Sequence, residues 1–295
     1  MDVRWPSLFA DYLTTSFVDL LRHSSPDLAP GVAFGVAPGA AFGALGAALG
    51  REGSGRGEGA GAVTAPEGTT ILALRYADGV VMAGDRQATE GYQVAHRRIE
   101  KVYKADEHSA VAIAGVAGPS IEMARLFQTE LEHYEKVEGD GLSLEGKANK
   151  LSQMIRMNLP MAMQGLVVVP IFAGFDLRQG VGRIFKYDVT GGRYEEIDYY
   201  ATGSGGKDAR TTLKRLYRPG ASLDDAIRMA AEGLLDAAEE DVGTGGPDFV
   251  HGIFPTMKAI TRAGYEEIPE ADVRRAFEAA VAARREASGS PQGAG

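Results

Sequence analysis

The feature that most constrains the fold of this chain is an abrupt change of composition and sequence pattern at Thr69. Up to Gly68 the sequence is dominated by Gly, Ala, Ser and Pro, and it shows neither helical nor strand periodicity. A loose arm is expected there. From Thr69 onward, "TTILALRY" and "GVVMAGDR" are apolar, β-branched runs that flank the turn signal Ala77-Asp78-Gly79. The sequence therefore predicts a folded domain that begins with a β-hairpin.

Blocks of strand pattern and helix pattern follow the first hairpin. The apolar periodicity predicts strands over 109–115, 166–176, 182–192, 194–205 and 252–268, and helices over 119–139, 143–165, 222–242 and 269–287. A Thr190-Gly191-Gly192 turn predicts that the strands over 182–192 and 194–205 form a hairpin. Because the strands occur in clusters, antiparallel sheets with helices packed outside them are favoured over a parallel sheet. An α+β layered domain is the expectation.

Composition excludes several classes of function. A chain of 295 residues with 44% apolar content can bury a large core, and its net charge of −9 argues against a nucleic-acid surface. With no Cys, it has no disulfide and no thiolate nucleophile, which fits a reducing cytoplasm. The five histidines show no zinc-ligand spacing. We expect no metal and no cofactor.

One segment is long enough to raise the question of a membrane span. The uncharged run from Gly31 to Gly50 could cross a bilayer by length alone, but it consists mainly of Gly and Ala and contains Pro38. We interpret it as a flexible arm, with a membrane helix as the minor alternative. The first residues lack a basic start followed by an apolar core, so a secretory signal is not expected.

The junction between Gly68 and Thr69 suggests a chemistry of its own. A cut there would give a terminus that carries a hydroxyl and an amine on one residue, which is a self-contained nucleophile and base. The plainer interpretation is that Thr69 only starts a strand. Thr64 is a rival cut site, but Pro66 close behind it would break the hydrogen-bond ladder that a catalytic strand requires.

An ordered set of short motifs resembles a known family. The motifs are "TTILAL" after Gly68, "GDRQAT", "IEKVY", "IAG", "ATGSGG" and "EDVGTGGPD", and they extend over most of the chain from Thr69. Together they are similar to β-type subunits of the actinobacterial 20S proteasome. The resemblance implies a four-layer αββα sandwich of two antiparallel sheets between helices, the fold of the N-terminal nucleophile hydrolases. It also implies a propeptide over 1–68, removed by autolysis, and a catalytic domain over 69–295.

The resemblance assigns a role to each candidate catalytic residue. Thr69 would be the nucleophile, and its amine, with a reference pKa of about 8, the base. Lys101 would favour loss of the hydroxyl proton, Asp85 would hold Lys101, and the amide of Gly115 would stabilise the oxyanion. The positions around the threonine amine correspond to Ser204, Asp241 and Thr244. Gln87 departs from the family, which often carries arginine at that position.

Substrate preference follows from the residues that the resemblance places in the pocket for the side chain before the cut. These residues are Ala88, Ile99, Ile113 and Ala117, while Thr89 and Ala117 would offer backbone bonds to an extended peptide. Such an apolar pocket would accept hydrophobic side chains and reject acids, which would lose their hydration without gaining a partner. A threonine endopeptidase with chymotrypsin-like preference is expected.

Expected partners also come from the resemblance. They are α-type proteasome subunits, further copies of this chain in heptameric rings, a hexameric regulatory ATPase reached through the α rings, and protein substrates, all in the cytoplasm. Neither nucleic acid nor a membrane is expected. Two other classes stay open: an amidohydrolase with the same nucleophile acting on a small molecule, and a catalytically silent ring scaffold or membrane-anchored protein.

Overall fold

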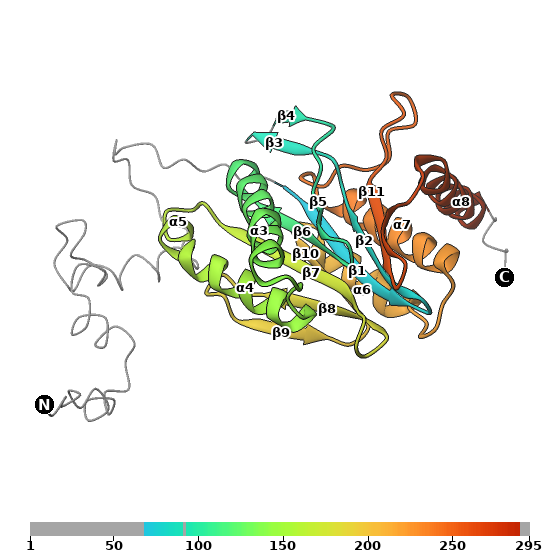
Figure 1. Ribbon diagram of the computed structural model, residues 1–295. Coiled ribbons are helices and arrows are strands. Elements are labelled where there is room, and N and C mark those ends of the chain that lie inside the picture. Colours follow the sequence, from blue (N-terminus) through green and yellow to red (C-terminus); the bar gives the residue numbers. More distant parts are fainter. Residues whose placement is uncertain (1–67, 91–92, 290–295) are drawn as a thin grey trace, which may run out of the picture. The chain divides into compact units, whose positions relative to one another are not determined.

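The computed structural model describes residues 68–90 and 93–289. Most of the expected propeptide, the rival threonine Thr64 and the Gly31–Gly50 run lie outside the described residues. In the part that is described, two five-stranded sheets lie face to face and helices cover both outer faces (Figure 1). None of the described helices is both long enough and apolar enough to cross a membrane.

The first sheet contains the strand that follows Thr69. Its order is β10-β1-β2-β11-β12, and every neighbouring pair is antiparallel. The bounds are β1 (Thr70–Tyr76), β2 (Gly79–Gly84), β10 (Tyr199–Gly203), β11 (Thr256–Thr261) and β12 (Gly264–Glu267). β1 and β2 are joined by a two-residue turn, so the predicted first hairpin is confirmed. β1 is buried along almost its whole length because it lies between β10 and β2, inside the sandwich.

The second sheet has the order β5-β6-β7-β8-β9 and is also antiparallel throughout. Its strands are β5 (Val102–Asp106), β6 (Ser109–Gly115), β7 (Val168–Asp176), β8 (Val181–Tyr187) and β9 (Arg193–Glu196). A small separate ribbon pairs β3 (Ala88–Glu90) with β4 (Gln93–His96). It extends beyond one end of the sandwich (Figure 1).

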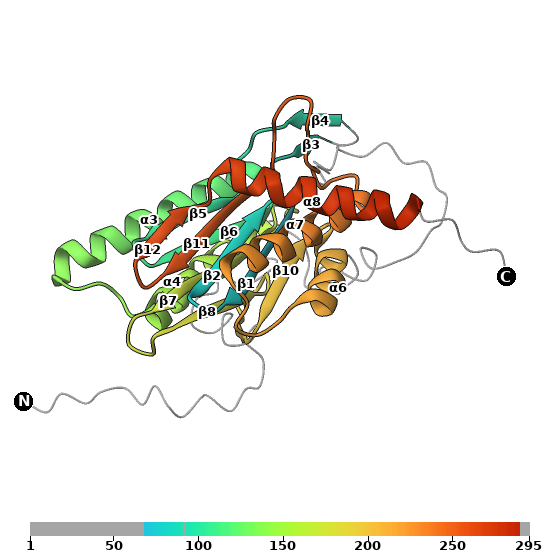
Figure 2. The same ribbon diagram turned by 90° about the vertical axis from the view of Figure 1, so that its right-hand side faces the viewer.

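Helices form the two outer layers. α3 (Ala117–Glu138) and α4 (Leu144–Met157) pack on the second sheet, and the short α5 (Leu159–Ala162) follows α4. The first sheet is covered by α6 (Gly206–Leu216), α7 (Leu223–Glu240) and α8 (Glu270–Gly289), which Figure 2 shows toward the viewer. Ser143 caps α4 and Ser222 caps α7, each accepting a hydrogen bond from a backbone N–H of the first turn.

Three clusters of buried apolar side chains hold the layers together. One fills the space between the sheets, with Ile71, Met82 and Ile171 fully buried. The second joins the first sheet to its helices, and the third joins the second sheet to α3 and α4. Three cores between four layers are what a helix-sheet-sheet-helix sandwich requires. The predicted αββα fold is confirmed.

The strand predicted over 194–205 is wrong as a single element. The strand is interrupted at Ile197 and Asp198. β9 pairs with β8 in the second sheet, whereas β10 pairs with β1 in the first. The β8–β9 hairpin at Thr190-Gly191-Gly192 does form. Ile197 is 74% exposed at the crossing, which shows that its apolar side chain does not mark a buried strand position.

Helix boundaries also differ from the prediction. The helix expected over 143–165 ends at Met157, because Pro160 interrupts it and lies instead in the first turn of the short α5, where its missing N–H is tolerated. α3 begins at Ala117, two residues before the expected start, with Pro119 tolerated in its first turn. α6 was not predicted from the sequence, although it supplies part of the core beneath the first sheet.

Candidate active site

Thr69 lies immediately before β1, at the end of the first sheet, and only 5% of its surface is exposed. Its nitrogen donates a hydrogen bond to Ser204 Oγ at 3.1 Å, and its carbonyl accepts one from the Ser204 nitrogen at 2.9 Å. The residue before the serine is Gly203, with φ +103°, and a Cβ there would lie 1.8 Å from the Thr69 oxygen. A glycine is therefore needed to bring the end of β10 against Thr69.

A buried ion pair lies beside the threonine. Lys101 Nζ is 2.7 Å from Asp85 Oδ1 and 2.6 Å from the carbonyl oxygen of Gln87. The Asp85 side chain is fully buried, and its oxygens also accept hydrogen bonds from the backbone nitrogens of Thr70, Gln87 and Gly245 at 2.8, 2.9 and 3.0 Å. With every partner in place, the buried carboxylate is fully hydrogen-bonded and holds the lysine in one position.

The side chain of Gln87 does not belong to this pair. Its amide nitrogen donates to the carbonyl of Val242 at 3.0 Å, so it fastens the loop after α7. Lys101 meets the backbone carbonyl of Gln87, a contact that any residue at this position could make. The departure from arginine therefore leaves the contact between residue 87 and the lysine intact.

A second network joins the residues expected around the threonine amine. Ser204 Oγ and Thr244 Oγ1 both donate to Asp241 Oδ2 at 2.5 Å. Thr244 Oγ1 also lies 2.6 Å from Thr70 Oγ1, which accepts a hydrogen bond from the Gly205 nitrogen at 3.0 Å. The network connects the end of β10, the loop after α7 and the start of β1, so Ser204 is held in place from three directions.

A narrow pocket beside Thr69 is lined by four of the five predicted substrate-binding residues. The open space inside is about 20 Å³, so an incoming side chain must displace lining atoms. Its lining consists of Thr69, Ala88, Ile99, Glu100, Lys101, Tyr103, Ile113, Gly115, Ala117, Ser120 and Ile121. Ala88, Ile99, Ile113 and Ala117 are therefore brought together with the nucleophile candidate, as expected.

Gly115 ends β6 at the edge of this pocket. Its φ of +124° is a conformation that only glycine adopts readily, and a Cβ there would lie 2.1 Å from the Val167 oxygen. Glycine thus allows the backbone to turn at the edge of the pocket that Thr69 also lines.

Gly68 and Thr89 are joined by a hydrogen bond just before Thr69. The Gly68 nitrogen donates to Thr89 Oγ1 at 3.0 Å, and the expected backbone bonds from Thr89 to a substrate peptide stay a prediction. Thr89 does not line the pocket. A Cβ on Gly68 would lie 2.0 Å from Gly243 Cα, so the chain entering β1 is packed directly on the loop after α7.

The sequence pattern of the family described as proteasome subunit matches residues 65–250. This chain belongs to the proteasome subunit family. A proteasome subunit beta from Acidimicrobium ferrooxidans is 60% identical over 215 residues, which is 73% of this chain and 79% of the relative. One from Streptomyces griseus is 46% identical over 291 residues, covering 99% and 96% of the two chains. The resemblance to actinobacterial β-type subunits is confirmed.

Four residues of the proteasome-family pocket were not predicted: Glu100, Tyr103, Ser120 and Ile121. Alternation along an extended strand places Tyr103 on the face of Lys101, and helical spacing places Ser120 and Ile121 on the face of Ala117. These two periodicities could have found three of the four. Burial, with Glu100 close by, raises the pKa of Tyr103 to about 12, so its phenol stays protonated at neutral pH.

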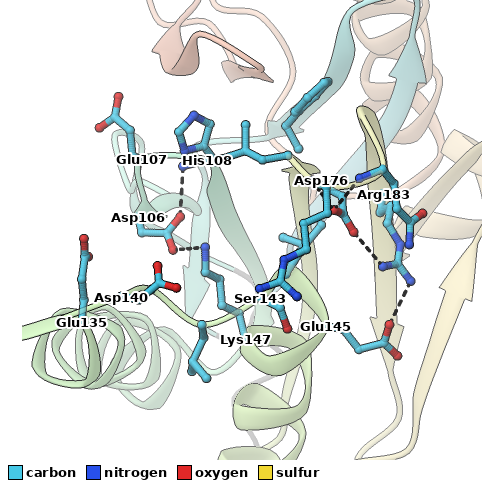
Figure 3. Close-up of a pocket in the computed structure, with 17 residues that line it drawn as sticks. Asp106, Glu107, His108, Glu135, Asp140, Ser143, Glu145, Lys147, Asp176 and Arg183 are labelled. Carbon is cyan, nitrogen blue, oxygen red and sulfur yellow. Dashed lines mark hydrogen bonds and ion pairs between the residues drawn. The ribbon is translucent and has the colours of Figure 1, made fainter. Parts of the chain in front are cut away.

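A larger pocket, of about 490 Å³, lies elsewhere in this proteasome subunit (Figure 3). It is bounded by the α3–α4 loop and by the turns that follow β5 and β7. Ion pairs line its sides, with Lys147 2.5 Å from Asp106 and Arg183 3.1 Å from Asp176. None of the predicted site residues lines it.

Proposed function

We propose that this chain is the proteolytic β-type subunit of a proteasome core and that its mature form begins at Thr69. The observation that carries the proposal is the environment of Thr69. Its nitrogen is held by Ser204, and it lines a mostly apolar pocket together with Lys101, which forms a buried ion pair with Asp85. A threonine that only starts a strand would need none of these neighbours.

In this proposal the Thr69 hydroxyl attacks the scissile carbonyl while its α-amine accepts the hydroxyl proton. The positive charge of Lys101 favours the developing alkoxide, and Asp85 keeps that charge in place. The Gly115 amide stabilises the oxyanion. The amine then protonates the leaving nitrogen, leaving an ester on Thr69 that water hydrolyses. Ser204, Asp241 and Thr244 orient the amine throughout.

Formation of the nucleophile is part of the same proposal. The hydroxyl of Thr69 attacks the carbonyl of Gly68, the peptide bond to the Thr69 nitrogen breaks, and hydrolysis of the resulting ester releases residues 1–68. The mature chain then has 295 − 68 = 227 residues. Autolysis and turnover thus require one and the same hydroxyl.

The pocket supports a hydrophobic preference. The lining is apolar at Ala88, Ile99, Ile113 and Ala117. An acidic side chain there would lose its hydration, and Lys101, the cation of the lining, already forms an ion pair with Asp85. Chymotrypsin-like cleavage is the proposed specificity.

The family also supports an assembly. We propose that α-type subunits and further copies of this chain form stacked heptameric rings, that a hexameric ATPase delivers protein substrates through the α rings, and that the particle works in the cytoplasm. Two relatives of this chain carry the name proteasome subunit beta.

Replacing the nucleophile tests the chemistry. Thr69→Ala removes the hydroxyl, so the chain assembled with α-type subunits should retain residues 1–68 and lose peptidase activity at once. Intact mass and hydrolysis of a peptide with Leu or Tyr before the cut measure both. Thr64→Ala is the matched control and should leave processing and turnover unchanged. Cleavage after Gly68 in Thr69→Ala alone, or a wild-type mature chain starting elsewhere, would refute the mechanism and favour the amidohydrolase or scaffold alternatives.

A further inference from the structure

One polar atom of the pocket beside Thr69 has no partner. Ser120 lies in the first turn of α3, is 6% exposed, and lines this pocket together with Ala117 and Ile121. The spacing of these three residues places their side chains on one face of the helix. Among the described residues, three buried side-chain atoms lack a hydrogen bond, and of these only Ser120 Oγ belongs to the pocket.

Apart from the Thr69 hydroxyl, which the proposed function uses as the nucleophile, the other polar side chains of the lining have partners. The Tyr103 hydroxyl donates to the Glu100 carbonyl, and Lys101 Nζ is held by Asp85. The Glu100 carboxylate accepts a hydrogen bond from Thr256 Oγ1 at 2.8 Å. A buried polar group without a partner is unusual in a folded protein, and it is explained when a ligand supplies the partner. Within an otherwise apolar lining, Ser120 can supply a hydrogen bond to a substrate side chain.

We propose that Ser120 is a specificity-determining residue that hydrogen-bonds the phenol hydroxyl of a tyrosine placed before the scissile bond. The inference rests on the proposed function and deepens it. Tyrosine and phenylalanine present the same ring to the pocket and differ only by the phenol hydroxyl, so comparing them isolates the effect of that group. Phenylalanine leaves Ser120 unpaired, whereas tyrosine satisfies both hydroxyls.

The experiment compares two peptides that differ only in Tyr or Phe before the cut, with the processed particle assembled with α-type subunits. The ratio of kcat/KM for Tyr over Phe should be roughly two- to tenfold, as one neutral hydrogen bond gives. Ser120→Ala should bring the ratio to about one by slowing the Tyr peptide, with the Phe peptide unchanged or faster. Processing should be unaffected, since the substitution removes no bond that the folded chain makes.

Thr129→Ala is the matched control, because Thr129 is an exposed hydroxyl residue on the same helix and outside the pocket. It should keep the wild-type ratio. A wild-type ratio of one, or a Tyr preference that survives in Ser120→Ala, overturns the role of Ser120 while the peptidase proposal stands. Equal slowing of both peptides in Ser120→Ala also overturns it, since that is the effect of a merely structural residue. Failure of the wild type to cleave either peptide overturns the proposed function itself.

Discussion

Gly68 lies where any side chain would collide with the backbone of Gly243. A Cβ at residue 68 would be 2.0 Å from Gly243 Cα, and the Gly68 nitrogen donates a hydrogen bond to Thr89 Oγ1. Gly68→Ala must therefore displace the bond that autolysis cuts. We expect processing to slow by about a hundredfold or more, because misplacing the reacting atoms by about 1 Å has effects of that size. Intact mass after timed assembly with α-type subunits measures the fraction processed.

Gly141→Ala is the control for that change, since nothing described lies within 4 Å of its Cβ position and it is far along the chain from the site. Its processing should match the wild type. Normal processing of Gly68→Ala would show that the contact with Gly243 does not govern the cut.

Lys101 offers a second test of the proposed chemistry. Lys101→Met keeps the length of the buried stem but removes the charge that favours alkoxide formation, so peptide hydrolysis should fall by about a hundredfold or more. Asp85 retains three backbone hydrogen bonds, which should let the chain fold. Lys104→Met is the control and should leave the rate unchanged, because Lys104 lies on β5, which begins after Lys101, and pairs with exposed Glu107. Equal rates for the two variants would remove Lys101 from the mechanism.

The residues of the candidate site could be predicted mainly where they belong to a motif shared with the family. Ser204 lies more than a hundred residues after Thr69 and Lys101 in the sequence, and no local pattern indicates that the three residues meet. The ordered motifs supplied that information, and the structure does bring the three together. The motifs could not show which atom of Gln87 contacts Lys101 or which atom of Thr89 contacts Gly68. These contacts depend on the backbone path of each loop.

Arg183 joins three strands and a helix through one buried guanidinium. It pairs with Asp176 on β7, with Glu195 on β9 and with Glu145 on α4, part of which Figure 3 shows. Burial alone would raise the pKa of Asp176, but the backbone N–H of Gln179 and the Arg183 guanidinium outweigh it, so the pKa is lowered. The pair therefore contributes stability above the unfolded-state pKa of Asp176, and this contribution is lost as pH falls through the folded-state value.

Arg183→Met should lower the free energy of unfolding by roughly 2 kcal/mol at pH 7, because it leaves a nearly buried carboxylate without its cation. The difference from the wild type should shrink at about pH 4 and below, where Asp176 protonates more readily in the variant. Urea titrations at the two pH values measure it. Lys136→Met, which breaks an exposed pair with Glu132, should change stability by less than about 1 kcal/mol. A loss that is the same at both pH values would mean that Asp176 is not the linked group.

Helices and strands with a regular hydrophobic periodicity were predicted well. Strands whose limits depend on the chain crossing from one sheet to the other were not. The first hairpin, β6, β7, α7 and α8 follow from periodicity in the sequence. The break between β9 and β10 does not, since both halves of 194–205 are strand-like and only the packing of two sheets decides that they separate. α6 follows the glycine-rich turn at 203–206, where the Gly content hid a helix start.

Several large apolar side chains remain at the surface of the described residues. Met157, Met163, Val242 and Val250 are 70%, 73%, 93% and 89% exposed, so parts of the surface are suited to burial against other chains. Mixing this chain with α-type subunits should yield stacked rings that hydrolyse peptides, with a processed β chain. Electron micrographs and native mass measure the product. Monomers alone, seen beside unassembled α-type subunits, would contradict the proposed assembly.

The pairing of β1 on both of its edges has a consequence for the moment of the proposed cut. β10 and β2 hold residues 70–74 and 71–76 in register while the Gly68–Thr69 bond is still intact. Breaking that bond changes which atoms are covalently joined without freeing the strand, so the new amine is formed where it will work. Amide hydrogens of β1 should then exchange with heavy water equally slowly before and after the cut. In this proposal the precursor already has β1 paired as the mature chain needs it, and the cut adds only a free amine at Thr69.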